Sequence, residues 1–315
     1  MRTFGVRIGI CSWTDRTLLR SGFYPAGCDT PARRLAFYAS QFDTVEVDST
    51  YYAFPDPANA VKWIAGTPRG FRFGVKSYSV FTWHRTKFAN LPAWLQGELG
   101  PRAKDERIRR DELTHGQRVR LFEDFIRPVR MLHDAGRLAY LLYQFPPGWA
   151  FRREGLVYFR RLREVSGPLP LAVEVRHKSW LEEDNRAVFL RALENENIAY
   201  TAVDEPALPW TVPPAWPVTA EWGTLVRFHG RNRAGWRDSA ASVHKRFDYR
   251  YSRAELEEWL PRVEKAARHF ARGTIYLMYN NCVEDKAVQA AMLIREMLKM
   301  DDPVPEAGRQ KGLGL

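Results

Sequence analysis

The sequence has few cysteines and no long apolar run. Its 315 residues include Cys11, Cys28 and Cys282, and no two of them form a CxxC motif. This low, odd number excludes a disulfide framework and favours a reducing compartment, so we expect a cytoplasmic protein. No stretch approaches the ~18 apolar residues of a membrane span. The N-terminus also lacks the apolar core of a signal peptide, and we expect no membrane partner.

A glycine-rich phosphate loop is also missing after the first apolar run, which weakens the case for an open, doubly wound sheet. Instead, eight short apolar runs alternate with helical patterns. Several runs are continuously apolar, as in strands that are covered on both faces. Together they predict an α/β fold, a (β/α)8 TIM barrel. The expected strands are residues 6–11, 43–48, 71–76, 138–145, 171–176, 198–204, 224–230 and 274–281.

Helix signals separate these runs. Thr30 before Pro31 and Asp56 before Pro57 are typical N-caps followed by proline at the first helical position. Further helical patterns cover residues 118–134, 152–165, 183–196, 253–271 and 284–299.

Long connections follow the third and seventh strands. The first contains the charged run 102–113, which predicts a solvated helix or a mobile arm. We expect one barrel domain over residues 1–300 and a disordered tail over residues 301–315.

Charged residues interrupt the expected strands, as in the run LAVEVRHKSW at 171–180. Side chains alternate between the two faces of a strand, so Val173 and Val175 oppose Glu174 and Arg176. The apolar face must meet the helices, which leaves the charged face to the barrel lumen. Four acids and four bases are expected there, towards the carboxyl ends of the strands: Glu46, Asp48, Glu174 and Asp204, with Arg72, Lys76, Arg176 and Arg227.

Two interpretations of these eight charges remain open. They can neutralise one another as a salt-bridged plug, because an unpaired buried charge costs several kcal/mol. Alternatively they line a site, since barrel enzymes place their chemistry at the carboxyl ends of the strands. His177 and His229 follow strands at the same end and titrate nearest to neutral pH, which favours a site.

Six segments resemble, in order, motifs of the domain-of-unknown-function-72 family, the YecE-like proteins: FDTVEVDSTYYAFP, TPRGFRFGVKSYSVFTWH, YLLYQFPPGW, LAVEVRHKSW, VRFHG and YLMYNNCVEDKAVQAAML. The resemblance covers roughly residues 6–299 and implies a TIM barrel without naming a reaction. The family usually has SGW after the first strand, where this chain has Cys11-Ser12-Trp13 and loses the freedom of a glycine. Cys11 and Cys282 follow neighbouring strands and could approach each other. They then form either a redox or metal pair or two buried, inert thiols.

The chain is basic, with 48 Lys and Arg against 37 Asp and Glu and a formal charge of +11. This balance favours a polyanionic partner, although a solvated basic surface has the same composition. Aromatic residues are interleaved with cations after the seventh strand. Cations neutralise phosphates, and rings stack on unpaired bases. The predicted nucleic-acid contacts are Arg231, Arg233, Arg237, Lys245, Arg246 and Arg250.

We therefore expect a nucleic-acid-binding barrel, with DNA preferred to RNA, that hydrolyses a phosphodiester or processes a damaged nucleotide in repair. Glu174 or Asp204 is the candidate general base and His229 the general acid. The full predicted catalytic set is Glu46, Glu174, Asp204 and His229. The predicted substrate-binding residues are Trp13, Tyr52, Lys76, Gln144, Arg176, His177, Trp180, Arg227 and Asn280, of which Lys76, Arg176 and Arg227 hold a phosphate-bearing ligand and Trp13, Tyr52 and Trp180 form stacking walls.

Two alternatives stay open. One is a metal-free enzyme acting on a carbohydrate or a phosphorylated metabolite, with Glu46 and Glu174 as paired carboxylates. The other is a ligand-binding barrel without catalysis. No cofactor is predicted. A divalent metal is a further alternative, with Glu46, Glu174, His177, Asp204 and His229 as ligands, but nearby cations oppose it.

Overall fold

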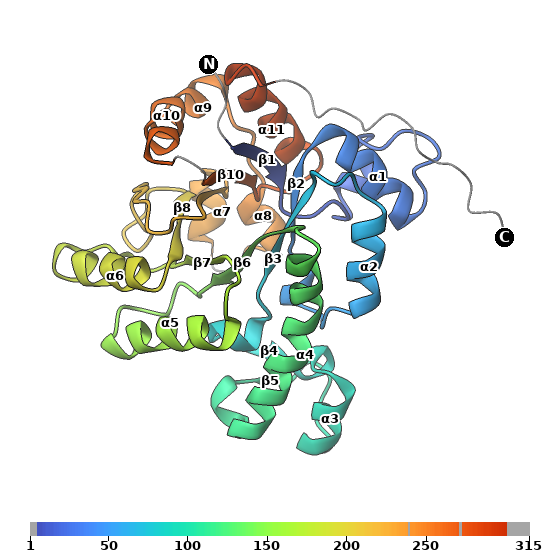
Figure 1. Cartoon of the computed structure of the whole chain (residues 1–315), viewed down its shortest axis with the longest axis vertical. Helices are drawn as coiled ribbons and strands as arrows, with labels where there is room; N and C mark the ends of the chain where they lie inside the picture. The colour runs from blue at the N-terminus through green and yellow to red at the C-terminus, as the bar shows by residue number, and fades with distance from the viewer. Residues whose placement is uncertain (1–4, 239, 271–272, 301–315) are drawn as a thin grey trace.

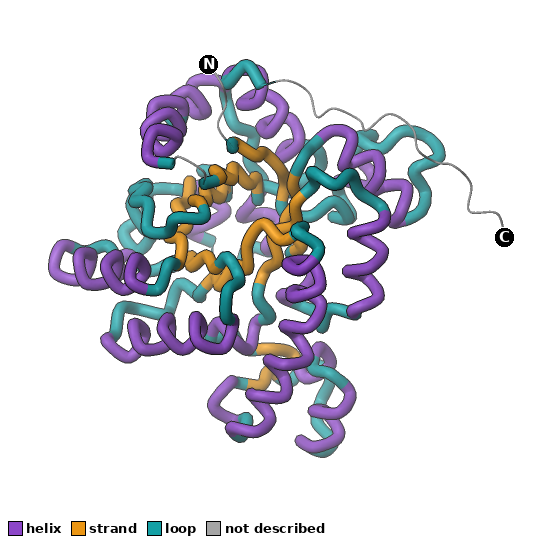
Figure 2. The backbone as a smooth tube through the Cα atoms, in the orientation of Figure 1, coloured by secondary structure: helices purple, strands orange, loops and turns teal. Residues whose placement is uncertain are grey.

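Eight parallel strands form the centre of the computed structural model, and helices surround them (Figures 1 and 2). The structure describes residues 5–238, 240–270 and 273–300. Neighbouring strands follow the order β1-β10-β9-β8-β7-β6-β3-β2, and a bridge between Cys11 and Glu46 joins β1 to β2. The barrel is therefore nearly closed, and the predicted TIM barrel is confirmed. Its strands are β1 (Val6–Ile10), β2 (Thr44–Val47), β3 (Arg72–Lys76), β6 (Leu138–Gln144), β7 (Leu171–Glu174), β8 (Ile198–Asp204), β9 (Gly223–Phe228) and β10 (Thr274–Tyr279).

The outer layer is helical. Thr30 and Asp56 cap their helices as predicted: Thr30 Oγ1 accepts from the Arg33 N–H at 3.2 Å, and Asp56 Oδ1 accepts from the Ala58 N–H at 2.8 Å. The helices are α1 (Pro31–Gln41), α2 (Pro57–Ala65), α3 (Ala93–Leu99), α4 (His115–Asp134), α5 (Arg153–Ser166), α6 (Glu183–Asn195), α7 (Arg233–Arg237), α8 (Val243–Phe247), α9 (Arg253–Glu257), α10 (Leu260–His269) and α11 (Lys286–Met297).

Aromatic side chains fill the lower part of the barrel lumen. The rings of Tyr140 on β6 and Tyr276 on β10 lie 5.3 Å apart. Because three strands separate β6 from β10, this contact crosses the lumen. Gly74 makes room for it, since a Cβ there would lie 2.3 Å from Tyr140 Cζ. The upper part of the lumen is left to the polar residues, and the Tyr140 hydroxyl donates to Glu46 at 3.0 Å.

The charged run 102–113 forms neither an α-helix nor a free arm, so that prediction is wrong; its one helical turn is the 3-10 helix Arg110–Glu112. It contains the short strand β5 (Arg107–Ile108), which pairs antiparallel with β4 (Thr86–Lys87). Ile108 is buried and anchors the hairpin. The surrounding charges remain near the surface, where Arg102 pairs with Glu106 at 2.7 Å. Three scattered apolar residues within a charged run, Ala103, Ile108 and Leu113, were too weak a signal to indicate a strand.

The predicted helix 253–271 is two helices, because Pro261 lies in the first turn of α10. Proline has no N–H to donate to the carbonyl four residues earlier, that of Glu257, and its ring clashes with that carbonyl, so α9 ends at Glu257 and α10 begins at Leu260. The connection after β9 also contains two short helices, α7 and α8.

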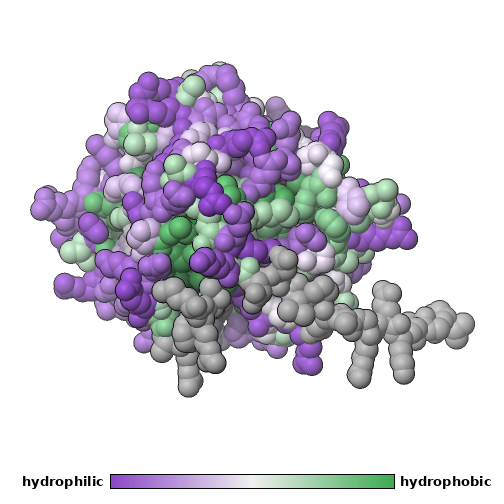
Figure 3. All heavy atoms as spheres, turned by 90° about the horizontal axis from the view of Figure 1, so that it is seen from above, coloured by the Kyte–Doolittle hydropathy of each residue, from purple (hydrophilic) through white to green (hydrophobic). Residues whose placement is uncertain are grey.

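Hydrophilic residues cover most of the face seen in Figure 3, and hydrophobic residues show in patches between them. In the parts of the chain that the structure describes, no helix has the length and apolar character to cross a membrane. The predicted disordered tail, residues 301–315, lies outside the described residues.

Candidate functional site at the carboxyl end of the barrel

A buried arginine lies at the centre of the upper lumen. Arg227 on β9 donates to Glu46 Oε1 of β2 at 2.6 Å and to Glu174 Oε2 of β7 at 2.7 Å. All three side chains are fully buried. One guanidinium therefore holds two carboxylates, and the salt-bridged interpretation applies to this inner group. Arg227 also fills the space between Glu46 and Glu174, where a glycosidase would need its sugar.

Glu174 has two further partners on its other oxygen. Its Oε1 accepts from Arg176 Nη1 at 2.7 Å and from His229 Nε2 at 3.1 Å. Burial alone would raise the pKa of Glu174, but the charges of Arg227 and Arg176 hold it well below its usual range. A carboxylate with so low a pKa has little tendency to take up a proton, so this geometry does not support a general base.

His229 is a neutral bridge in the same network. Burial and the nearby Arg176 lower the pKa of His229 to about 3. Its Nδ1 lies 2.9 Å from the Asn280 side-chain nitrogen, which donates to it, and its Nε2–H points to Glu174. Because the imidazole carries no extra proton at neutral pH, it is not arranged as the predicted general acid.

Asp204 lies outside the lumen, so its predicted position is wrong. Its carboxylate accepts from Arg231 Nη2 at 2.7 Å, Tyr251 Oη at 2.8 Å and Trp259 Nε1 at 2.7 Å. Trp259 directly precedes α10, and Tyr251 precedes α9, so these bonds tie β8 to the outer helices. The three donors satisfy a buried carboxylate and indicate a structural role for it.

Glu205, the residue after β8, faces the lumen instead and was missed by sequence reasoning. Its Oε2 lies 3.1 Å from Arg176 Nη2, and its Oε1 accepts from the Val212 N–H at 3.2 Å. Burial raises the pKa of Glu205 to about 7, although Arg176 partly opposes this shift. Arg176 therefore joins a firmly ionised carboxylate, Glu174, to one that titrates near neutral pH.

A cavity of about 720 Å³ opens above this network, and we refer to it as the mouth. Five of the predicted substrate-binding residues line it: Tyr52, Lys76, Gln144, Arg176 and Asn280. Aromatic rings of Tyr51, Trp210, Trp236 and Phe247 form further parts of its wall. The mouth lies at the carboxyl ends of the strands, as the sequence predicts.

Cations and rings are paired inside the mouth. The Arg176 guanidinium lies 4.9 Å from the centre of the Trp236 ring, and Lys76 Nζ lies 4.7 Å from that of Tyr51. Lys76 also pairs with Asp48 at 2.8 Å. These contacts hold the two cations on the floor of the mouth at about the distance expected for cation–π attraction.

Three predicted mouth residues lie elsewhere. Trp13 packs edge-on against Trp63 of α2 with 5.7 Å between ring centres. Trp180 is fully buried and stacks on Trp149 at 4.6 Å. His177 caps a short 3-10 helix by accepting from the Ser179 N–H at 3.2 Å. The predicted stacking roles of Trp13 and Trp180 are therefore wrong, since their rings fill the layer between the barrel and its helices.

Only some of the six predicted nucleic-acid contacts lie in the mouth. Arg246 lines the mouth. Arg231 is bound to Asp204 and to Glu258, with Nη2 2.8 Å from Glu258 Oε2. Lys245 pairs with Asp238 at 2.9 Å. The other predicted contacts, Arg233, Arg237 and Arg250, are exposed.

Two mouth residues carry no signal in the sequence. Arg16 is exposed in the connection after β1, and His84 lies in the connection after β3. Burial and the neighbouring Lys76 lower the pKa of His84 to about 4. Neither residue belongs to a strand or helix, so no periodicity could place it.

The five predicted metal ligands do not converge. Asp204 lies outside the lumen, and His177 caps a helix. Among the described residues, no group of three or more His, Cys, Asp and Glu side chains has an arrangement that could hold a metal ion. The Cys282 thiol donates to the Cys11 carbonyl at 3.2 Å, and burial raises the pKa of both thiols.

Ser12 carries backbone strain at the edge of the mouth. It has φ 111°, in the region that favours glycine, at the position where the resembled family has one. We expect Ser12→Gly to raise the free energy of unfolding by about 1 kcal/mol, because it relieves this strain. Urea denaturation measures the change. Ser12→Ala keeps the Cβ and is the control, and an equal gain from it would contradict the strain explanation.

Three comparisons with known proteins agree. A family model described as "Protein of unknown function DUF72" matches residues 7–311. The UPF0759 protein YunF of Bacillus subtilis (strain 168) is 28% identical over 300 residues, which are 94% of this chain and 95% of that protein. A DUF72 family protein of Thermotoga maritima MSB8 has a TM-score of 0.72 and 29% identity, with 94% of this chain and 99% of that chain covered. A second DUF72 family protein, from Enterococcus faecalis V583, has a TM-score of 0.76 and 24% identity, with 96% of this chain and 100% of that chain covered.

Proposed function

This chain belongs to the DUF72 family, whose name assigns it no activity, and from the mouth alone we propose that it binds single-stranded nucleic acid. One observation carries the proposal: cations and exposed aromatic rings share one cavity. Tyr52 and Trp210 are 48% and 42% exposed. Such rings stack on unpaired bases, while neighbouring cations attract the phosphates.

The phosphates would meet the rim of the mouth and not its floor. Arg176 and Lys76 are nearly buried and paired with carboxylates, so they have little capacity left for a phosphate. Arg16, which is exposed, and Arg246, which is half-buried, line the same cavity nearer to solvent. This division differs from the predicted one, in which Lys76, Arg176 and Arg227 hold the phosphate.

The buried network would orient the groups that meet a base. Arg227 Nη1 donates to Gln144 Oε1 at 3.0 Å, which leaves the Gln144 amino group as a donor. The Asn280 amino group is used by His229, which leaves the Asn280 carbonyl as an acceptor. A donor and an acceptor on the floor of an aromatic pocket suit the edge of a nucleobase.

Fluorescence anisotropy with a labelled single-stranded DNA oligonucleotide tests the proposal. We expect affinity to fall with salt, by about 0.7 in log K per neutralised phosphate for each unit of log salt concentration. RNA of the same sequence tests the predicted preference for DNA. The absence of binding at low salt would refute the proposal. Equal competition by a mononucleotide or a sugar phosphate would favour the metabolite alternative.

Reversing either rim charge is expected to weaken oligonucleotide binding about tenfold, the size of effect that loss of a phosphate contact produces at low salt. The variants are Arg16→Glu and Arg246→Glu. Arg69→Glu is the matched control, because Arg69 precedes β3 at the opposite end of the barrel and undergoes the same change of charge. An equal loss in Arg69→Glu would show that net charge alone governs binding.

Phosphodiester hydrolysis, repair and a cytoplasmic location remain finer parts of the proposal. The same oligonucleotide, incubated with the protein and separated on a denaturing gel, tests cleavage. If the protein binds the oligonucleotide and does not cut it, hydrolysis is excluded and the proposal reduces to a nucleic-acid-binding protein. Added Mn²⁺ or Zn²⁺ extends the assay to the metal alternative.

A further inference from the structure

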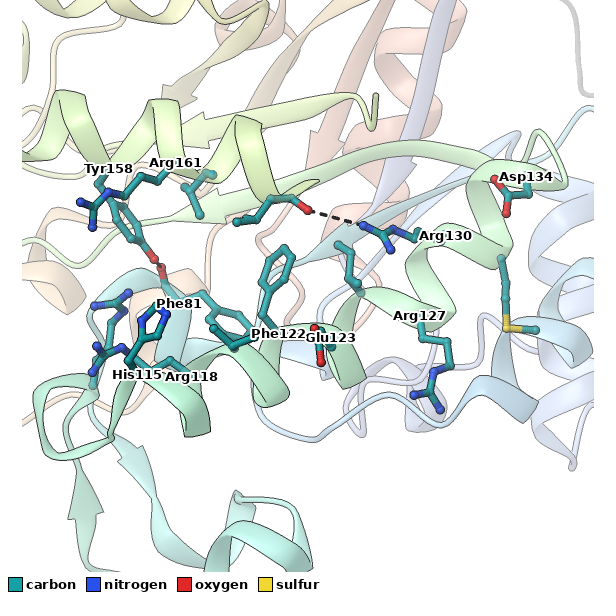
Figure 4. Close-up of a pocket in the computed structure, with 16 residues that line it drawn as sticks. Phe81, His115, Arg118, Phe122, Glu123, Arg127, Arg130, Asp134, Tyr158 and Arg161 are labelled. Carbon is teal, nitrogen blue, oxygen red and sulfur yellow. Dashed lines mark hydrogen bonds between the residues drawn. The ribbon is translucent and has the colours of Figure 1, made fainter. Parts of the chain in front are cut away.

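A long groove lies on the outside of the barrel between α4 and α5 (Figure 4), and it shares no lining residue with the mouth. Its volume is about 730 Å³. α4 packs against α2, and α5 packs against α6, so the groove remains between the two pairs. Its lining on α4 runs from His115 to Asp134, the whole length of that helix. At 1.5 Å per residue the groove is about 28 Å long.

α4 carries two apolar stripes. One includes Leu121 and Phe125 and is buried against the barrel. The other consists of residues at helical spacing on the groove side, among them Val119, Phe122 and Ile126. A surface helix needs one apolar stripe to pack on its core, so apolar residues that continue onto the groove side from Val119 to the buried Ile126 indicate a second packing surface.

The groove remains partly exposed and has a positive border. Val119 of α4 and Val165 of α5 are 42% and 49% exposed. Five arginines, Arg110, Arg118, Arg127, Arg130 and Arg161, border it, against Glu123 and Asp134. Figure 4 shows arginines on both the α4 side and the α5 side. The groove therefore combines an apolar floor with an excess of positive charge.

We propose that this groove binds an amphipathic helix of a partner protein whose apolar stripe is flanked by acidic residues. Helix-in-groove recognition uses apolar anchors at i, i+3, i+4 and i+7, which match the spacing along α4. The length suits about five helical turns. Acidic flanks complement the arginines and fix the orientation of the helix.

Charge argues against a second copy of the chain as the occupant. In a two-fold dimer the same patch meets itself, so the five arginines of one groove would face those of the other. Like charges placed together at an interface cost several kcal/mol. A partner of opposite charge has no such cost.

A designed peptide of roughly 20 residues tests the proposal, with leucines at helical spacing, glutamates on the flanks and a fluorescent label. Anisotropy against the full chain is expected to show saturable binding that salt weakens. A peptide of the same composition in scrambled order is expected to bind at least about tenfold more weakly, since it has no apolar stripe. Equal binding by both peptides would overturn the proposal.

Two matched pairs of variants locate the site. Val119→Glu is expected to weaken peptide binding at least about tenfold. Val157→Glu on α5 has the same exposure, 42%, lies outside the groove and is expected to change binding less than about twofold. Arg161→Glu and its neighbour Arg160→Glu form the second pair, with Arg161 alone of the two in the groove lining. Circular dichroism checks that each variant is folded.

Two results would overturn the assignment. If both members of each pair have equal effects, the peptide binds elsewhere. If sedimentation shows a dimer of the wild-type chain that Val119→Glu dissociates, the groove is occupied by a second copy. A monomer that binds the acidic peptide, with Val119→Glu and Arg161→Glu weaker than their partners, supports the proposal.

Discussion

Replacing Arg227 with methionine is expected to lower the free energy of unfolding by about 3–5 kcal/mol, which is the usual cost of breaking a buried ion pair from one side. Arg227 is fully buried between Glu46 and Glu174, at 2.6 and 2.7 Å. Methionine preserves much of the apolar stem but leaves two carboxylates without their main positive partner. Guanidinium denaturation followed by circular dichroism measures the loss.

A rescue separates charge from packing in this prediction. Glu46→Gln and Glu174→Gln, added to Arg227→Met, remove the unpaired charges and keep the shapes of both side chains. The combined variant is expected to recover most of the loss, because the residues form one network and their effects are not additive. If it stays as unstable as Arg227→Met alone, the loss comes from packing and the electrostatic explanation is wrong.

The sequence places Arg227 and its partners correctly because their strands have unequal faces. Glu174 and Arg176 alternate with Val173 and Val175, and only one arrangement buries the valines against the helices. The same alternation puts Glu46 in the lumen. These positions required no knowledge of tertiary structure beyond a closed barrel.

β8 shows where this reasoning ends. The lumen face of IAYTAVD consists of Ala199, Thr201 and Val203, so only a single threonine marks that face, and it carries no charge. From the sequence, Asp204 is therefore taken as the lumen acid at the end of β8. The register instead pairs Val203 with the inward Arg227, which turns Asp204 outward. Glu205 has the same parity as Val203, which places it in the lumen beside Arg176. Only the strand register could reveal this.

Arg72 shows a different limit. Alternation puts it on the same face as Lys76, but it is the first residue of β3 and lies at the amino end of the barrel, where its guanidinium donates to the Arg69 carbonyl at 3.0 Å. Alternation along a strand predicts which face a side chain lies on, but it does not predict how far along the barrel axis the side chain lies. Likewise, Trp180 follows a strand, yet the 3-10 turn directs its ring beneath the helices.

Stability is expected to depend on the ionisation of Glu205, whose pKa burial raises from 4.5 to about 7 in the folded chain. A group with a raised folded pKa stabilises most below its unfolded pKa, and this contribution is lost as pH rises through the folded value. Between pH 4.5 and pH 8 the wild type should therefore lose about 3 kcal/mol relative to Glu205→Gln, which stays neutral. Urea unfolding of both proteins across this range measures the difference.

The difference between the two proteins is needed because His229 acts in the opposite direction. Its folded pKa of about 3 lies below the unfolded value of 6.5, so its contribution is present above pH 6.5 and is lost as pH falls. Subtracting the free energy of unfolding of Glu205→Gln from that of the wild type at each pH removes the pH dependence that His229 contributes to both proteins. Glu182→Gln, at a half-exposed position before α6, is the control and should follow the wild type at every pH. A flat difference curve would mean that Arg176 keeps Glu205 ionised throughout, and that the floor of the mouth does not change its charge near neutral pH.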